Sequence, residues 1–208
     1  MVASKGLVLL LALPLAALRM TNVRQAGSPS GQFSAERIDV RTPLVDVAAV
    51  RAAVAPFSCA ILRRGDKVLA EVRGADAQAA ASKLTCYGGK RERGENSVQC
   101  VVRELHEELG WAPDHIPDEP ACSLLVDGYL IAHFYEASVD RTDFVTEGRA
   151  FEFVDESDDR WSAWHARVLE ARRRGDAVAT FDDDPDATLG LLRHVPTAGE
   201  EGLERRYY

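Results

Sequence analysis

The sequence predicts an α+β fold built on a mixed β-sheet. Short apolar runs typical of strands, joined by tight turns, occur both before and after one central helical stretch, and further helical periodicity follows only near the C-terminus. The chain has 208 residues, of which 46% are hydrophobic and 28% charged, so it holds enough apolar material for a core. A doubly wound parallel sheet would need strands and helices in alternation, which this order lacks.

The first predicted strands lie at 57–62 (FSCAIL) and 68–72 (VLAEV), and the polar segment RRGDK between them predicts a hairpin. A further short strand, LTCY at 84–87, runs directly into Gly88 and Gly89. The clearest hairpin joins 123–126 to 129–139, because Asp127-Gly128 supplies the positive φ that such turns require. RAFEFV at 149–154 adds a strand, 162–174 is helical with Gly175 as its stop, and a weaker helix follows Pro185.

The central helix is predicted over 96–109. Asn96 can cap its N-terminus, Gln99 completes a capping box, and Gly110 can end it. At helical spacing its apolar residues form one narrow stripe: Val98, Val101, Val102, Leu105 and Leu109. We therefore expect this stripe to face the core.

Three carboxylates share a separate face of this helix. Glu104, Glu107 and Glu108 stand at i, i+3 and i+4, where like charges repel by a few tenths of a kcal/mol per pair. Arg103 could offset that repulsion by pairing with Glu107 or with Glu95. A divalent cation is the other candidate, since Mg²⁺ prefers oxygen ligands and suits a phosphate-bearing substrate.

The charge balance bears on the partners. Lys and Arg total 25 against 33 Asp and Glu, a formal net charge of −8. Such an acidic chain lacks the basic face that direct nucleic-acid binding needs, so we expect no such binding. The glycines of the loop 88–94 allow its backbone to approach a ligand, and one of its carbonyls could join the oxygen donors.

The segment Gly88 to Trp111 closely resembles the Nudix hydrolase signature, G-x5-E-x7-R-E-U-x-E-E-x-G-U, where U is a bulky apolar residue. Its nine specified positions are filled without a gap by Gly89, Glu95, Arg103, Glu104, Leu105, Glu107, Glu108, Gly110 and Trp111. Two departures are Tyr87, where many members have Pro before the glycines, and Trp111 in place of an aliphatic residue. Neither stands at a ligand position. The resemblance implies a Nudix-type α/β/α sandwich over residues 55–195.

The resemblance also implies roles for the residues of the signature. Four of them would hold the catalytic ion, Mg²⁺ or Mn²⁺: Glu104, Glu107, Glu108 and, through its carbonyl, Gly89. Arg103 would support the site by bridging the helix carboxylates and Glu95. For the general base we favour Glu108, with Glu107 and the downstream Glu147 and Glu152 as alternatives.

Substrate contacts are predicted at Arg91 and Arg93, because they are cationic and lie in the glycine loop. Arg63 and Arg64 are further candidates, although surface arginines of an acidic protein fit equally well. Tyr129 resembles the tyrosine that marks dinucleoside polyphosphate hydrolases, and a strand-start tyrosine beside a turn explains it equally well.

The activity implied is the divalent-metal-dependent hydrolysis of a pyrophosphate linkage in a nucleoside diphosphate linked to another moiety. The alternative is a non-catalytic Nudix-fold module with a nucleotide-sensing or regulatory role. In either case the expected partner is a small-molecule nucleotide.

The N-terminal extension, 1–54, contains an apolar run at 7–18 that is too short for a membrane span and fits the core of a signal peptide. The other interpretation is that Met20 is the true start. The first predicts a secretory or organellar protein, the second a cytoplasmic one. We expect membrane association only if this segment is retained, and we take 196–208 as a C-terminal tail.

The four cysteines are Cys59, Cys86, Cys100 and Cys122, and none forms a C-x-x-C pair, so a zinc ribbon is not expected. Their apolar neighbours predict buried core thiols. For three other features we expect structural roles. Trp161 and Trp164 are expected to pack on the core, and the acidic run 182–184 suits a helix start better than a second metal site.

Overall fold

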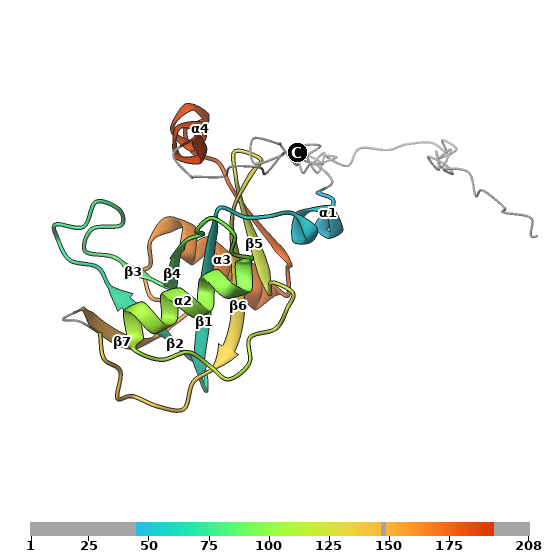
Figure 1. Cartoon of the computed structure of the whole chain (residues 1–208). Helices are drawn as coiled ribbons and strands as arrows, with labels where there is room; N and C mark the ends of the chain where they lie inside the picture. Colours follow the sequence, from blue (N-terminus) through green and yellow to red (C-terminus); the bar gives the residue numbers. More distant parts are fainter. Residues whose placement is uncertain (1–44, 147–148, 194–208) are drawn as a thin grey trace, which may run out of the picture. The chain divides into compact units, whose positions relative to one another are not determined.

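A computed structural model describes residues 45–146 and 149–193. In chain order they form α1 (Val47–Ala52), β1 (Phe57–Arg64), β2 (Lys67–Val72), β3 (Leu84–Thr85), β4 (Tyr87–Lys90), α2 (Ser97–Leu109), β5 (Cys122–Val126), β6 (Tyr129–Ser138), β7 (Ala150–Asp155), α3 (Ala163–Arg174), β8 (Val178–Phe181) and α4 (Pro185–Arg193) (Figure 1). The signal-like segment 7–18, Glu147 and the tail 196–208 lie outside the described residues.

The described strands form one mixed sheet. Its main path is β3-β2-β1-β6-β5-β8, with β4 also pairing with β1 and β7 with β2. The β1/β6 and β5/β8 pairs are parallel, whereas β1/β2, β1/β4, β2/β7 and β5/β6 are antiparallel. The α+β class with a mixed sheet is confirmed.

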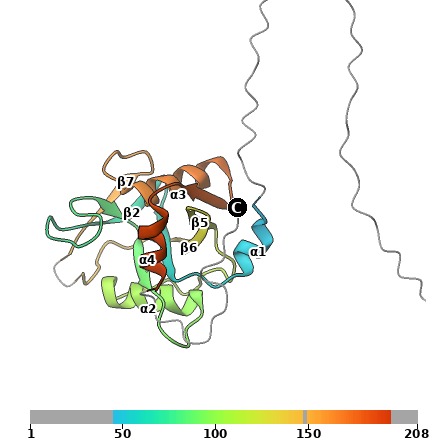
Figure 2. The ribbon, with the colours of Figure 1, turned by 90° about the horizontal axis from the view of Figure 1, so that it is seen from above.

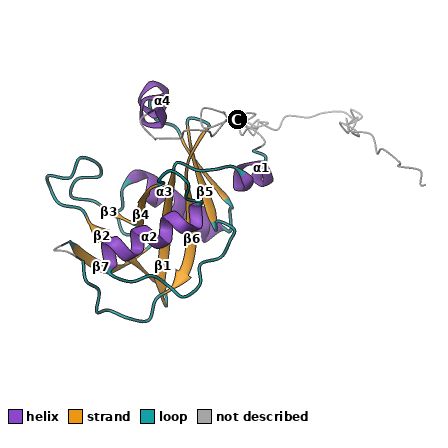
Figure 3. Cartoon of the chain, viewed as in Figure 1, coloured by secondary structure: helices purple, strands orange, loops and turns teal. Residues whose placement is uncertain are grey.

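Helices α2 and α3 cover opposite faces of this sheet. Val101, Leu105 and Leu109 of α2 pack in one buried cluster, and Val168 and Leu169 of α3 pack in another. Seen from above, the strands lie between the two helices (Figure 2). The same layers, helix on sheet on helix, can be followed in the view coloured by secondary structure (Figure 3). This is the α/β/α sandwich that the resemblance of the signature implies.

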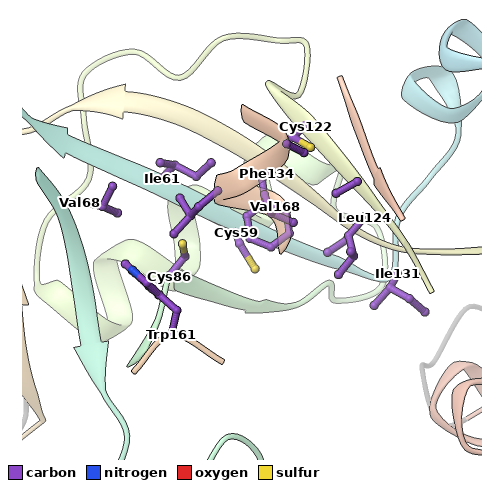
Figure 4. Close-up of a cluster of buried hydrophobic side chains, with 14 of the residues drawn as sticks. Cys59, Ile61, Val68, Cys86, Cys122, Leu124, Ile131, Phe134, Trp161 and Val168 are labelled. Atoms are coloured by element: carbon purple, nitrogen blue, oxygen red, sulfur yellow. The ribbon is translucent and has the colours of Figure 1, made fainter. Parts of the chain in front are cut away.

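The four cysteines are buried free thiols, as predicted. Cys59, Cys86 and Cys122 belong to the cluster on the α3 side, where Figure 4 shows them among apolar side chains. Burial raises the pKa of the Cys86 and Cys122 thiols to about 12, so both stay protonated at neutral pH. Trp161 is buried in the same cluster, as expected from the sequence.

The segment LTCY is not one strand, which corrects the prediction. Leu84 and Thr85 pair with β2, whereas Tyr87 begins β4 and pairs with β1. Strands β1 and β2 pair with each other only near their connecting hairpin, so each leaves an edge open farther along. Strand β3 pairs with the open edge of β2, and after Cys86 strand β4 pairs with the open edge of β1. Gly88 and Gly89 therefore belong to strand β4 and not to a loop.

Two short elements were not predicted. Helix α1 is capped by Asp46, whose side chain accepts a hydrogen bond from the Ala49 N–H, and strand β8 pairs with β5 alone among the described strands. Val50 of α1 is fully buried against Leu125 and Leu130. We therefore propose that the folded domain begins before residue 55.

The β5/β6 turn and the start of helix α4 are built as the sequence predicts. Asp127 and Gly128 both have positive φ at the β5/β6 turn, as predicted. The Asp127 carboxylate accepts hydrogen bonds from the Asp183 N–H and the Thr188 hydroxyl, and Asp184 accepts one from the Asp186 N–H. The acidic run thus begins helix α4. Within the described residues, every helix is too short or too polar to cross a membrane.

Candidate active site

Helix α2 carries most of the predicted site residues, and its ends are built as the sequence indicates. The Asn96 side chain accepts a hydrogen bond from the Gln99 N–H at 2.8 Å, and the Gln99 side chain accepts one from the Asn96 N–H at 2.9 Å. Gly110 ends the helix with φ 63°. The capping box and the glycine stop are confirmed, and they set where the carboxylates of the helix lie.

The three carboxylates of α2 have different environments. The side chains of Glu104 and Glu108 are only 14% and 11% exposed, whereas that of Glu107 is 58% exposed. Burial raises the pKa of both Glu104 and Glu108. One helical face therefore supplies two shielded carboxylates and one that faces solvent.

Strand β4 covers the two shielded carboxylates, and its glycines make the close approach feasible. The Gly88 N–H donates to Glu108 Oε2 at 3.1 Å. A Cβ on Gly89 would lie 2.5 Å from the Glu104 carboxyl carbon. The Gly89 carbonyl accepts a weak hydrogen bond from the Cys100 thiol of α2, so this oxygen faces the helix.

Arg103 ties the loop to the helix. Its Nε donates to Glu95 Oε1 at 2.7 Å, and its NH1 group lies 2.9 Å from both Glu104 Oε1 and Glu107 Oε2. Its NH2 group donates to the Lys90 carbonyl. The hydrogen bond from Arg103 lowers the pKa of Glu95. The geometry is that of a bridge between the loop and two of the helix carboxylates.

A second arginine reaches the site from outside the signature. NH1 of Arg149, just before β7, lies 2.6 Å from Glu108 Oε1 and 3.2 Å from Glu71 Oε1. Glu71 lies on β2 and is 5% exposed. The sequence reasoning missed both residues. The signal for Glu71 was a lone carboxylate within the apolar run VLAEV, whereas Arg149 carried no signal.

Glu71 is held by several donors. Arg73 NH1 donates to its Oε2 at 3.0 Å, and the Thr85 hydroxyl donates to the same oxygen at 3.3 Å. Beside this group, the fully buried Tyr87 has a hydroxyl without a hydrogen-bond partner among the described residues. Burial raises the pKa of Tyr87, and the nearby Glu71 and Glu108 raise it further.

The residues predicted to contact substrate differ in their exposure to solvent. Arg91 is 4% exposed and donates to the carbonyls of Ala55 and Glu95, so it fixes the loop, and its contact with substrate stays a prediction. Tyr129 is buried in the cluster on the α3 side, across the sheet from the carboxylates of α2, and its contact with substrate also stays a prediction. Arg93 is exposed in the loop.

The remaining candidates lie apart from the α2 carboxylates. Arg63 pairs with Glu136 and Glu156, and the Arg64 guanidinium stacks 3.7 Å from the centre of the Phe153 ring. Glu152 is exposed on β7 and accepts hydrogen bonds from Arg160. A cavity of about 550 Å³ is lined in part by Arg63, Glu136 and Arg172, and no α2 carboxylate lines it.

The donor set suits a hard divalent cation in its chemistry. Carboxylate oxygens from α2 and the Gly89 carbonyl oxygen are the ligands that Mg²⁺ and Mn²⁺ prefer. Within 45–146 and 149–193, however, no three Asp, Glu, His or Cys side chains converge on one point where an ion could sit. Arg103 lies between Glu104 and Glu107, and Arg149 holds an oxygen of Glu108.

Comparison with known proteins adds three findings. A family model described as NUDIX domain matches residues 54–186, more than half of the chain. The 8-oxo-dGTP diphosphatase of Escherichia coli (strain K12) is 46% identical over 55 residues, which are 26% of this chain and 42% of that protein, so the match spans less than half of this relative.

Two solved structures are similar in fold. The MutT protein from Methanosarcina mazei Go1 has a TM-score of 0.47 and 19% identity, covering 59% of this chain and 94% of its own. A NUDIX hydrolase from Nitrosomonas europaea has a TM-score of 0.47 and 21% identity, covering 62% and 80% respectively.

Proposed function

Because this chain belongs to the Nudix family, we propose that it is an enzyme that hydrolyses a pyrophosphate linkage in a nucleoside diphosphate joined to another moiety, with Mg²⁺ or Mn²⁺ as cofactor. The observation that carries the proposal is the complete signature, whose Glu104 and Glu108 lie shielded beneath the glycines of β4. A carboxylate pair kept in such surroundings costs stability unless a cation offsets its charge.

The proposed cation ligands are Glu104, Glu107, Glu108 and the Gly89 carbonyl. When bound, a divalent cation would neutralise charge on the diphosphate and lower the pKa of the attacking water. Arg103 would keep Glu104 and Glu107 in register with the loop through its contacts with Glu95 and the Lys90 carbonyl.

Glu108 is our candidate for the general base, with Glu107 as the alternative. The Gly88 N–H donates to one oxygen of Glu108, whose side chain is only 11% exposed, so this carboxylate is held in a fixed orientation. The side chain of Glu107 is 58% exposed. Since a base must be oriented toward the water that it activates, the fixed orientation favours Glu108.

The substrate class is tested by incubating the purified chain with Mg²⁺ or Mn²⁺ and a panel of nucleotides. The panel comprises ADP-ribose, dinucleoside polyphosphates, NADH, CoA and nucleoside triphosphates, together with 8-oxo-dGTP, for which the Escherichia coli relative is named. Metal-dependent release of phosphate or nucleotide from one member supports the proposal. Binding without turnover of any member would favour the nucleotide-sensing alternative.

The role of Glu108 is tested with Glu108→Gln. We expect turnover of the best panel member to fall by about 100-fold or more, because the base is removed while the side-chain volume is kept. Glu170→Gln on α3 is the matched control, since Glu170, like Glu108, forms an ion pair with arginine (here Arg167 and Arg174) and lies on the other face of the sheet. Near-normal turnover in Glu108→Gln would show that Glu108 is not the base.

A further inference from the structure

Arg149 touches two carboxylates that come from different elements. Its NH1 group contacts Glu108 of α2 and Glu71 of β2, yet the side chain remains 47% exposed. Both carboxylates are largely buried, at 11% and 6% side-chain exposure. The half-exposed guanidinium of Arg149 therefore lies between solvent and two shielded carboxylates.

Among the described residues, Arg149 uses only one of the three guanidinium nitrogens for hydrogen bonds. A guanidinium has five N–H donors, of which NH1 carries two. All hydrogen bonds that Arg149 makes with described side chains go through NH1, so its Nε and NH2 donors are available to another acceptor. Arg103 differs, because its Nε, NH1 and NH2 all donate to protein groups and its side chain is only 22% exposed.

The fold fixes where Arg149 stands. Strand β7 pairs with β2 in the register Val72↔Ala150 and Glu71↔Phe151, which puts Arg149 just beyond the last pair and beside Glu71. The preceding segment is tied to the end of α2, since the Val145 N–H donates to the Leu109 carbonyl. Glu71 is itself held by Arg73 and Thr85, so it offers a fixed anchor.

A buried hydroxyl without a hydrogen-bond partner among the described residues lies in the same part of the fold. The fully buried Tyr87 hydroxyl has no hydrogen-bond partner among the described residues, and the charges of Glu71 and Glu108 act on it. Buried hydroxyls normally find a hydrogen-bond partner, often an ordered water or a ligand. The unpaired hydroxyl is therefore an observation, separate from the carboxylates, that fits a polar ligand near this group.

We propose that Arg149 is a substrate-contacting residue. In the metal-bound enzyme its guanidinium would stay anchored by Glu71 and would leave Glu108 free to be a cation ligand. The same guanidinium would then donate hydrogen bonds to a non-bridging oxygen of the substrate's diphosphate. This inference rests on the proposed function. A planar guanidinium with free donors suits phosphate oxygens in charge and in geometry. Glu71 is then a positioning residue, because it acts through Arg149.

The proposal predicts opposite changes in two binding constants for Arg149→Gln. Mn²⁺ should bind more tightly than to the wild-type chain, by several-fold, because Glu108 no longer has a competing cation. Inorganic pyrophosphate, measured in saturating Mn²⁺, should bind about tenfold more weakly, because a charge-assisted hydrogen bond is lost. Both constants can be measured by calorimetry on the full chain, with circular dichroism to check folding.

Arg160→Gln is the matched control. Arg160 is 46% exposed and, like Arg149, pairs with two carboxylates, Glu152 and Asp158, which lie outside the proposed site. Neither binding constant should change in this variant. Arg149→Lys should keep Mn²⁺ affinity near the wild-type value while pyrophosphate binding stays weakened, since a single ammonium cannot contact Glu71 and a phosphate in the same way. This variant serves if Arg149→Gln does not fold.

Glu71→Gln tests the positioning role. We expect weaker pyrophosphate binding, and in turnover a raised KM with a smaller change in kcat, because Arg149 loses its anchor. Equal Mn²⁺ and pyrophosphate affinities in Arg149→Gln and the wild type would overturn the inference. These equilibrium measurements need no turnover, so they decide the role of Arg149 even if no panel substrate is hydrolysed. If the chain is active but Arg149→Gln leaves both affinities unchanged, only this inference is refuted and the proposed function stands.

Discussion

Glu104, Glu107 and Glu108 are identical side chains within one and a half turns of a helix, yet each meets a different environment. Glu104 and Glu108 lie under β4, where burial raises their pKa, and Glu107 faces solvent beside Arg103. Helical spacing predicts one shared face. Helical spacing carries no information on the strand that covers part of that face, so the different burial of the three carboxylates depends on β4.

His133 is a buried titratable residue outside the proposed site. Its Nε2 lies 2.9 Å from the Ala53 carbonyl oxygen and its Nδ1 2.9 Å from the Ser123 hydroxyl. A carbonyl only accepts hydrogen bonds, so Nε2 carries the proton and Nδ1 accepts from Ser123. Burial lowers the pKa of His133, and a second proton would have to displace the Ser123 hydrogen bond.

This arrangement predicts a pH dependence of stability. An unfolded histidine has a pKa of about 6.5, so as pH falls below this value the unfolded state binds more protons than the folded state, and the free energy of unfolding decreases. His165, whose pKa is lowered to about 4, acts in the same direction. Urea unfolding followed between pH 7.5 and pH 5 should show this loss.

His133→Gln should be less stable overall but should show a shallower pH dependence over that window. His115 is exposed, so His115→Gln should keep the wild-type dependence and serves as the control. An unchanged slope in His133→Gln would mean that other groups account for the loss.

Among the elements, β4 is the one that sequence patterns described least well. LTCYGG was expected to be a strand followed by a loop, but its residues belong to two strands that pair with different partners. The pairing depends on edges of β1 and β2 that exist only once their hairpin has formed. Strand β8 was missed for a similar reason, since it is short and pairs with β5 alone.

The two glycines of β4 should respond differently to substitution by alanine. A Cβ on Gly88 would lie 2.3 Å from the Ser58 carbonyl oxygen at φ 138°, and this backbone cannot move aside. Gly88→Ala should lower the free energy of unfolding by at least about 2 kcal/mol. The three atoms nearest to a Cβ on Gly89 would all belong to the carboxylate of the Glu104 side chain. Gly89→Ala should therefore fold, and turnover should drop roughly 100-fold as that carboxylate is displaced.

Urea unfolding and turnover measured on both variants separate these effects. Gly175→Ala is the control for positive φ alone, because a Cβ there meets nothing within 4 Å, and it should cost about 1 kcal/mol without affecting turnover. A Gly89→Ala protein with full activity would show that the position of Glu104 is not needed for turnover.

At the scale of the whole molecule, the sheet joins segments from both halves of the chain around α2. Strand β1 lies between β6 and the β2/β4 edges, and β7 returns to β2 from far along the sequence. Of the 33 acidic residues of the chain, Glu71, Glu104 and Glu108 are brought together with their side chains shielded in this part of the fold. The fold keeps them apart from the cysteine-bearing core on the α3 side.

This arrangement predicts that Mg²⁺ stabilises the folded protein. At about 100 times its Kd, a ligand that binds only the folded state adds about 2.7 kcal/mol, or roughly 5–10 °C in Tm for a chain of this size. Scanning calorimetry with and without Mg²⁺ would measure the shift. Glu108→Gln should reduce it and Glu170→Gln should not. An unchanged Tm at saturating Mg²⁺ would argue against an ordered cation site in the free protein.

The sequence by itself determined the fold class, the caps and apolar stripe of α2, the Asp127-Gly128 hairpin and the residues of the signature. All of these depend on contacts between residues near one another in the chain, or on a fixed spacing along one helix. Only the tertiary structure decided that Arg91 and Tyr129 are buried and that Glu71 and Arg149 join Glu108. Arg149 stands 41 residues from Glu108 and 78 from Glu71. Their contact follows from the β2/β7 register and the packing of α2 against β4, which local sequence patterns do not encode.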